Sequence, residues 1–210
     1  MNIITYEDII FVMKHDGKFL EKMLTVQFCK ELKNNFPSYD KDLEDYLFFS
    51  SCKLGNMKVA KYMASEIKGT DRYWKVLDAG LNWAVDFRNY KLAYFLIEKN
   101  ADFTNSFNYS VKKAAEDGKL KFLKAVKEKC NNFDFAFEEQ TLLKISLLSK
   151  DSNAKTIKFL IENGCCDQVL LNRTLEKFIM EDNVPMVNFL VENGADPASC
   201  MFSYVKYVYR

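Results

Sequence analysis

The segment Phe189-Leu190-Val191-Glu192-Asn193-Gly194-Ala195-Asp196 has two close counterparts in the same chain. They are Phe95-Leu96-Ile97-Glu98-Lys99-Asn100-Ala101-Asp102 and Phe159-Leu160-Ile161-Glu162-Asn163-Gly164. Each segment ends an amphipathic run with Gly or Asn, which tolerate the left-handed backbone conformation that commonly follows a helix. The chain is therefore expected to contain repeated helices that end in similar turns.

The same frame extends to five positions, which we call the anchor residues. Each lies at the start of an amphipathic run: Gly55, Arg88, Gly118, Ser152 and Asp182. Successive anchors are 33, 30, 34 and 30 residues apart. A period near 33 is typical of ankyrin repeats and one near 34 of tetratricopeptide repeats, so the period alone leaves both families open.

The residues around the anchors separate the two families. A short helix is expected before each anchor, over Asp45 to Lys53, Leu81 to Phe87, Val111 to Glu116, Leu142 to Ser149 and Thr174 to Glu181. Small or apolar residues precede the anchors by four and three positions, among them Ala84, Ala114 and Leu148. A second helix follows each anchor. This unit resembles the ankyrin repeat, and four of the seven glycines occupy positions where that family uses glycine.

The resemblance covers roughly residues 44–198 and implies an all-α chain, an α-solenoid of about five degenerate ankyrin-like helix-turn-helix repeats. The family's Thr-Pro-Leu-His motif is absent, so irregular linkers are expected at Phe103 to Tyr109, Phe133 to Gln140 and Asp167 to Asn172. We expect one repeat domain over 1–210, with helical caps at 1–43 and 199–210, because an end repeat would otherwise expose its apolar side.

The caps have their own sequence signals. Thr5 and Asp8 are spaced as a capping pair for a first helix. A second helix is expected after Gly17, with apolar positions at Phe19, Leu20, Met23, Leu24 and Val26. The closing helix would carry Met201, Phe202, Val205 and Val208 on one face.

Composition favours a folded core and disfavours several function classes. Apolar residues make up 49% of the chain and charged residues 28%, and the formal net charge is +1. That balance argues against a general binder of nucleic-acid backbones. No run of 18 apolar residues and no signal-peptide pattern is present, so no membrane span is expected. Six cysteines without a C-x-x-C pair predict reduced thiols and a cytoplasmic location, the host cytoplasm if the chain is viral.

The sequence offers little that resembles a catalytic, metal or cofactor site, and we expect none; an enzyme with an unfamiliar site is the alternative. The one histidine, His15, is expected at a helix end, where the helix dipole favours it. Two acidic clusters, at Asp40 to Asp45 and at Glu138 and Glu139, are expected to be solvated helix starts. Glycine-rich phosphate-binding loops are absent, so no small-molecule substrate is predicted.

Several apolar side chains are assigned to a core or to an exposed surface. The aromatic residues seven positions after an anchor, Tyr62, Phe95, Phe159 and Phe189, are predicted to lie in the core. Leu96, Leu160 and Leu190, one position further, are predicted to be buried between neighbouring units. Trp83 and Phe87 lie at positions that face the concave groove in ankyrin-like units, although burial between irregular repeats is an alternative for both.

By resemblance, the predicted function is a scaffold that binds a protein partner through its concave repeat surface. Similar degenerate repeats occur in proteins of large DNA viruses, phages and intracellular bacteria, which would make the partner a host factor, for example of a defence system. Nucleic acid is an alternative partner, through the basic helix face Lys119–Lys129. The candidate partner-binding residues are Phe49, Lys53, Trp83, Asp86, Phe87, Lys112, Lys113, Glu116, Lys177 and Met180.

Overall fold

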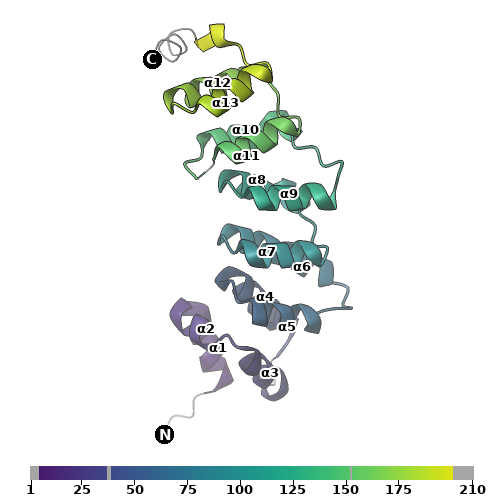
Figure 1. The fold of residues 1–210 in the computed structure, drawn as a ribbon. Coiled ribbons are helices and arrows are strands. Elements are labelled where there is room, and N and C mark those ends of the chain that lie inside the picture. Colours follow the sequence, from purple (N-terminus) through teal and green to yellow (C-terminus); the bar gives the residue numbers. More distant parts are fainter. Residues whose placement is uncertain (1–4, 37–38, 152, 201–210) are drawn as a thin grey trace. The chain divides into compact units, whose positions relative to one another are not determined.

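The computed structural model describes residues 5–36, 39–151 and 153–200, and this part of the chain is helical with no strand (Figure 1). The all-α fold class is therefore confirmed for the described residues. The α-helices are α1 Tyr6–His15, α2 Gly17–Met23, α3 Val26–Asn35, α4 Lys41–Leu54, α5 Met57–Glu66, α6 Tyr73–Asp86, α7 Tyr90–Glu98, α8 Asn105–Glu116, α9 Leu120–Lys129, α10 Phe137–Leu148, α11 Ala154–Glu162, α12 Gln168–Met180 and α13 Val184–Glu192. A 3-10 helix, η1, spans Pro197–Cys200.

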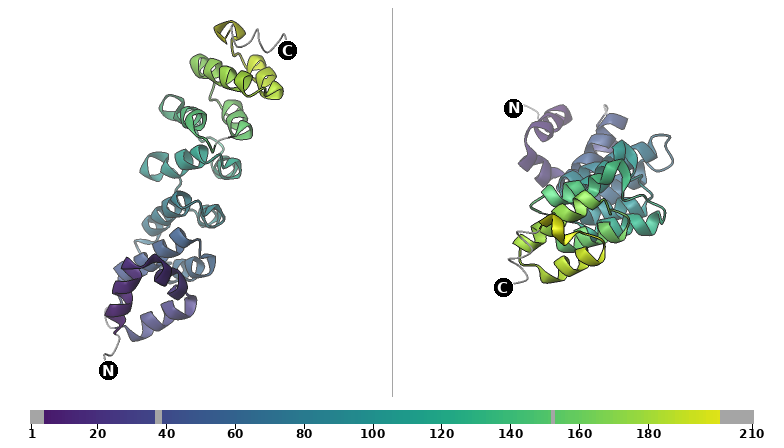
Figure 2. Two further views of the ribbon diagram at one scale, coloured as in Figure 1. Left: turned by 90° about the vertical axis from the view of Figure 1, so that its left-hand side faces the viewer. Right: turned by 90° about the horizontal axis from the view of Figure 1, so that it is seen from above.

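The chain forms two compact units, Met1–Ser110 and Val111–Arg210, whose boundary falls within α8. In the first unit, α4 packs against both α5 and α6, and α6 packs against α7 (Figures 1 and 2). In the second unit, α10 packs against α11 and α12, and α12 packs against α13 and η1. Among the described residues, no helix is both long and apolar enough to cross a bilayer.

The core of the first unit depends on a close approach of α4 and α6. Leu47 and Phe48 of α4 and Leu77 and Leu81 of α6 are fully buried. Gly80 makes this approach possible, because a Cβ atom there would lie 2.4 Å from Cε1 of Phe48. A glycine inside a helix normally lowers its stability, so its position in α6 is explained by this contact.

The helix pairs turn where the sequence predicted. Four anchors have the left-handed backbone conformation, with φ of 69° at Gly55, 60° at Arg88, 62° at Gly118 and 51° at Asp182. The fifth anchor, Ser152, lies outside the described residues. The second helices all begin two residues after an anchor. The exit positions Asn100, Gly164 and Gly194 also have positive φ.

An asparagine follows the anchor in four of the five pairs and was not recognised in the sequence. In three of them, Asn56, Asn153 and Asn183, Oδ1 accepts a hydrogen bond from an amide in the first turn of the second helix. Asn89 instead donates through Nδ2 to the carbonyl oxygens of Cys52 (3.0 Å) and Lys53 (2.7 Å) at the end of α4. Asn153 donates similarly to the Gly118 carbonyl oxygen at 3.1 Å. Asn89 and Asn153 therefore connect their helix pairs to the preceding ones.

The first helices begin earlier than predicted. Asp40 caps α4, since its Oδ1 accepts a hydrogen bond from the Leu43 amide at 2.9 Å, and α4 therefore starts four residues before Asp45. The helix α6 starts at Tyr73 rather than Leu81, because Val76 and Leu77 add a buried apolar turn. The linkers predicted at Phe103 to Tyr109 and Phe133 to Gln140 each contain a left-handed turn, at Ser106 to Asn108 and Glu138 to Gln140.

Leu148 lies in a different environment from the residues at the same position in the other helix pairs. It is 87% exposed, whereas the residues at the same distance from the other anchors are buried. The buried residues of α10 are Leu142, Leu143 and Ser146, which lie two positions earlier in the frame than their equivalents in α4. Five residues separate α10 from α11, against three between α12 and α13. The longer turn shifts α10 relative to the anchor frame.

The aromatic residues seven positions after the anchors are only partly in the core. Phe159 is buried, but Tyr62, Phe95 and Phe189 are half-buried. A lysine ammonium lies over each of the three half-buried rings: Lys30 over Tyr62 at 5.8 Å, Lys61 over Phe95 at 5.5 Å and Lys158 over Phe189 at 4.6 Å. In contrast, Leu96, Leu160 and Leu190 are fully buried, as predicted.

The N-terminal helices agree with their capping signal and differ in one boundary. Thr5 Oγ1 accepts from the Asp8 amide at 3.2 Å, and Asp8 Oδ2 accepts from the Thr5 amide at 2.9 Å. The predicted second helix is two helices, since Thr25 ends the run and caps α3. The predicted closing helix, with Met201, Phe202, Val205 and Val208, lies outside the described residues.

Candidate partner-binding surface

Trp83 and Phe87 form an exposed aromatic pair at the end of α6. The helix buries Leu77, Leu81 and Val85 against the core, while Trp83 and Phe87, four residues apart, share another face. They are 41% and 42% exposed, and their rings stack with centroids 5.7 Å apart and an interplanar angle of 16°. Of the two alternatives that the sequence left open, exposure is observed for both side chains and core burial for neither.

The end of α4 contributes a cation to this pair. The ammonium of Lys53 lies 4.9 Å from the ring centroid of Phe87. Phe49, one turn earlier on α4, is half-buried, and its ring is tilted against Phe48 at 5.9 Å. Lys53 therefore lies next to the exposed Trp83–Phe87 pair, whereas Phe49 packs partly toward the core.

A shallow hollow adjoins Trp83 on the other side. It has a volume of about 250 Å³ and is lined by Ala79, Asn82, Trp83, Asp86 and Tyr109. Tyr109 donates a hydrogen bond from its hydroxyl to Oδ1 of Asp86 at 2.6 Å. Asp86 therefore has a neutral partner and does not stand alone as a charge. Tyr109 was not among the predicted residues, because the segment Phe103 to Tyr109 was predicted to be an irregular linker, whereas Tyr109 lies on α8.

The remaining candidate residues belong to the second unit, and most are engaged in polar contacts there. Lys112 pairs with Glu138 at 2.6 Å, and Lys113 pairs with Glu116 at 2.9 Å. Lys177 is half-buried, and its ammonium donates to the Leu147 carbonyl oxygen at 3.5 Å. Met180 is highly exposed at the end of α12. These residues provide a polar surface with one apolar side chain.

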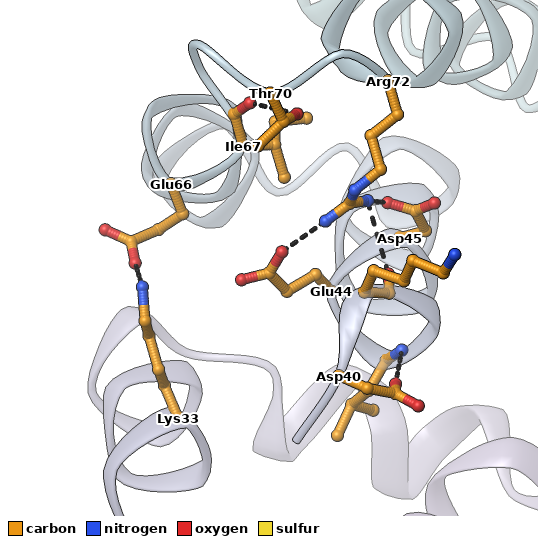
Figure 3. Close-up of polar contacts among 10 residues, drawn as sticks. Lys33, Asp40, Glu44, Asp45, Glu66, Ile67, Thr70 and Arg72 are labelled. Atoms are coloured by element: carbon orange, nitrogen blue, oxygen red, sulfur yellow. Dashed lines mark hydrogen bonds and ion pairs between the residues drawn. The ribbon is translucent and has the colours of Figure 1, made fainter. Parts of the chain in front are cut away.

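The acidic cluster at the start of α4 is not simply solvated, contrary to the expectation. Arg72, which precedes α6, binds the carboxylates of Glu44 and Asp45 and also donates to the Lys41 carbonyl oxygen at 3.3 Å (Figure 3). Arg72 is half-buried and presents the planar fork that suits carboxylates. Its spacing of 27 residues from Asp45 gave no signal in the sequence. The cluster fastens the linker between α5 and α6 to α4.

Other chemically capable side chains are accounted for by packing. His15 lies in the last turn of α1, where its Nδ1 is 2.7 Å from the Phe11 carbonyl oxygen and its ring stacks on Phe11. Burial raises the pKa of the Cys29 thiol to about 11 and those of Cys52 and Cys165 to about 12. These three thiols are protonated at neutral pH and are poor nucleophiles. No cluster of metal-ligating side chains occurs among the described residues.

The basic face of α9 is partly occupied. The helix buries Phe122, Leu123 and Val126, as its amphipathic pattern predicts. Lys127 is half-buried and donates a hydrogen bond to Oδ1 of Asn163. Lys121 and Lys124 are exposed. The face thus combines solvated lysines with one that joins α9 to the end of α11.

Comparison of the chain with protein-family models, with curated proteins and with solved structures found no match.

Proposed function

We propose that the chain is a recognition scaffold that binds a protein partner, and that its five helix pairs are degenerate ankyrin-like repeats forming an α-solenoid. The repeated left-handed anchors and the asparagines that follow them support the proposed repeat relationship. In the first unit, the proposed partner-binding surface would be formed by the first helices α4 and α6.

The observation that carries the binding proposal is the exposed Trp83–Phe87 stack. Tryptophan is among the residues most enriched at energetic hot spots of protein interfaces. An exposed, mutually stacked pair is already ordered, so little side-chain entropy is lost when a partner covers it. Lys53 over Phe87 and the Tyr109–Asp86 hydrogen bond provide polar groups at its edge. A host factor as partner remains a proposal from the resemblance alone.

Site-specific photo-crosslinking tests this proposal. A photoreactive residue replaces Phe87 in one protein and Phe11, an equally apolar exposed residue on α1, in a control protein. In native cells, the Phe87 position is expected to crosslink one protein reproducibly, and the Phe11 position is expected not to do so. Crosslinking of nucleic acid, or of the same protein from both positions, would contradict a protein-binding surface at Trp83 and Phe87.

A further inference from the structure

A second cavity in the first unit lies away from the Trp83–Phe87 pair. It has a volume of about 950 Å³ and is lined by the end of α5, the linker into α6 and the end of α7. Pockets for small molecules typically measure about 300–1,000 Å³. The cavity is therefore large enough for a ligand of several hundred daltons, and the lining residues indicate which chemistry it suits.

The lining is positively charged. The cavity lining contains three lysines, Lys61, Lys68 and Lys99, and one carboxylate, that of Glu98. The formal charge of the lining is therefore +2, in a chain whose total is +1. The ammonium groups of Lys61 and Lys99 lie 5.5 and 5.8 Å from the centroid of the same ring, that of Phe95. Two of the three cations thus lie near one ring, and a concave surface with an excess of one sign of charge attracts ligands of the opposite sign.

An exposed indole lies in the same cavity. Trp74 is 52% exposed, and its ring meets the buried Tyr73 edge-on with centroids 4.8 Å apart. Tyr73 supports one side of the indole, while the exposed part is available for a flat group of a ligand. Exposed tryptophan faces stack well on planar heterocycles, including nucleobases. The cavity therefore combines an anion-attracting wall with a stacking surface.

The linker that forms one side of the cavity is held in place. Arg72 binds Glu44 and Asp45, so its guanidinium is directed to α4 (Figure 3). The amide and hydroxyl of Thr70 both donate to the Ile67 carbonyl oxygen, at 3.1 and 2.7 Å. Because the linker is fixed in this way, the cavity does not have to be ordered by its ligand.

We propose that this cavity binds a small anion that carries a planar ring, the chemical class of the nucleoside phosphates. The ring stacks on Trp74, and the phosphate groups lie near Lys68, Lys99 and Lys61. This site lies on other residues than the proposed partner-binding surface and does not depend on it.

Fluorescence of Trp74 tests the proposal directly. The chain has two tryptophans, so the variant Trp83→Phe leaves Trp74 as the only indole. Excited near 295 nm, away from nucleotide absorption, this protein is titrated with adenosine diphosphate and separately with pyrophosphate. We expect saturable quenching by the nucleotide and at least tenfold weaker binding of pyrophosphate by calorimetry, because pyrophosphate lacks the ring.

Charge reversal at the lining lysines tests the anion part. Lys68→Glu with Lys99→Glu is expected to weaken nucleotide binding at least tenfold. The control, Lys58→Glu with Lys91→Glu, makes the same change in net charge on exposed residues of α5 and α7 outside the cavity and is expected to leave affinity within twofold. Melting temperatures verify that each variant is folded.

Three results would overturn the proposal. The first is an absence of saturable quenching by the nucleotide. The second is equal weakening by the two double variants, which would indicate attraction to the net charge alone. The third is pyrophosphate binding as tight as that of the nucleotide, which would exclude a role for the ring. An acidic aromatic peptide that bound through Trp74 while the nucleotide did not would replace the proposed ligand class.

Discussion

The turn between α4 and α5 and the turn between α10 and α11 each connect the two helices of a pair, but they differ in length and backbone conformation. Two residues, Gly55 and Asn56, separate the first pair of helices, whereas five residues separate the second pair. At Gly55 the left-handed backbone brings the Asn56 amide to the Ser51 carbonyl oxygen at 2.8 Å. At Ser149 the backbone is extended, and the hydroxyl donates to the Glu116 carbonyl oxygen at 2.6 Å. A tight turn fixes the helix register, and a longer turn releases it.

The largest expected effect is the difference in unfolding free energy between two leucine truncations in the α10–α11 pair. Leu160 in α11 is fully buried, and Leu160→Ala is expected to cost about 2–5 kcal/mol of unfolding free energy. Leu148→Ala, in the same helix pair, is expected to cost under about 0.5 kcal/mol, because that side chain is already in solvent. Urea unfolding of both variants measures the difference. A loss of unfolding free energy at Leu148 comparable to that at Leu160 would contradict the shifted position of α10, because it would mean that Leu148 is buried.

Gly55→Ala should show how demanding the tight turn is. The residue has φ of 69°, and a Cβ atom would lie 2.6 Å from Oδ1 of Asn89. We expect a loss of about 1–3 kcal/mol from backbone strain and this contact. Lys150→Ala in the longer turn is the control, with a change within about 0.5 kcal/mol because Lys150 is exposed.

A double-mutant cycle by thermal unfolding separates the two causes at Gly55. The Gly55→Ala loss should shrink in an Asn89→Ala background, since the side chain that blocks the Cβ atom is then gone. An unchanged loss would assign the effect to backbone strain alone.

The asparagines after the anchors provide the finest distinction. Asn89→Asp replaces an amide that donates to two carbonyl oxygens with a carboxylate, and a loss of about 1–3 kcal/mol is expected. Asn153→Asp keeps the acceptor that caps α11 through the Thr156 amide and loses one donor, so a loss below about 1 kcal/mol is expected. Chemical denaturation near neutral pH measures both. Equal losses would show that the two asparagines have the same role.

Part of this structure could be predicted from local signals in the sequence. Gly, Asn and Asp favour a left-handed turn, and periodic apolar residues favour an amphipathic helix, so the turns at Gly55, Gly118 and Asp182, the second helices and the buried Leu96, Leu160 and Leu190 were predictable. These features depend on residues that lie close together in the chain. For Trp83 and Phe87, the repeat frame left both exposure and burial open.

The features that were missed depend on contacts between distant segments. Arg72 binds Glu44 and Asp45, which lie 28 and 27 residues earlier in the chain. Asn89 binds carbonyl oxygens at the end of α4, which lie 36 and 37 residues earlier. The exposure of Leu148 goes with the longer turn after α10, which the anchor frame did not reveal. Tyr109 lines the hollow next to Trp83 from the start of α8, in a segment that was predicted to be a linker. Such contacts have no fixed spacing and therefore leave no local pattern.

The central claim is that the Trp83–Phe87 pair contributes to binding and little to folding. The direct measurement is the melting temperature and the affinity for the crosslinked partner of one double variant, Trp83→Ala with Phe87→Ala. We expect affinity to fall at least tenfold, about 1.4 kcal/mol, while the melting temperature stays near that of the wild type. A folded double variant that binds its partner with wild-type affinity would contradict the account.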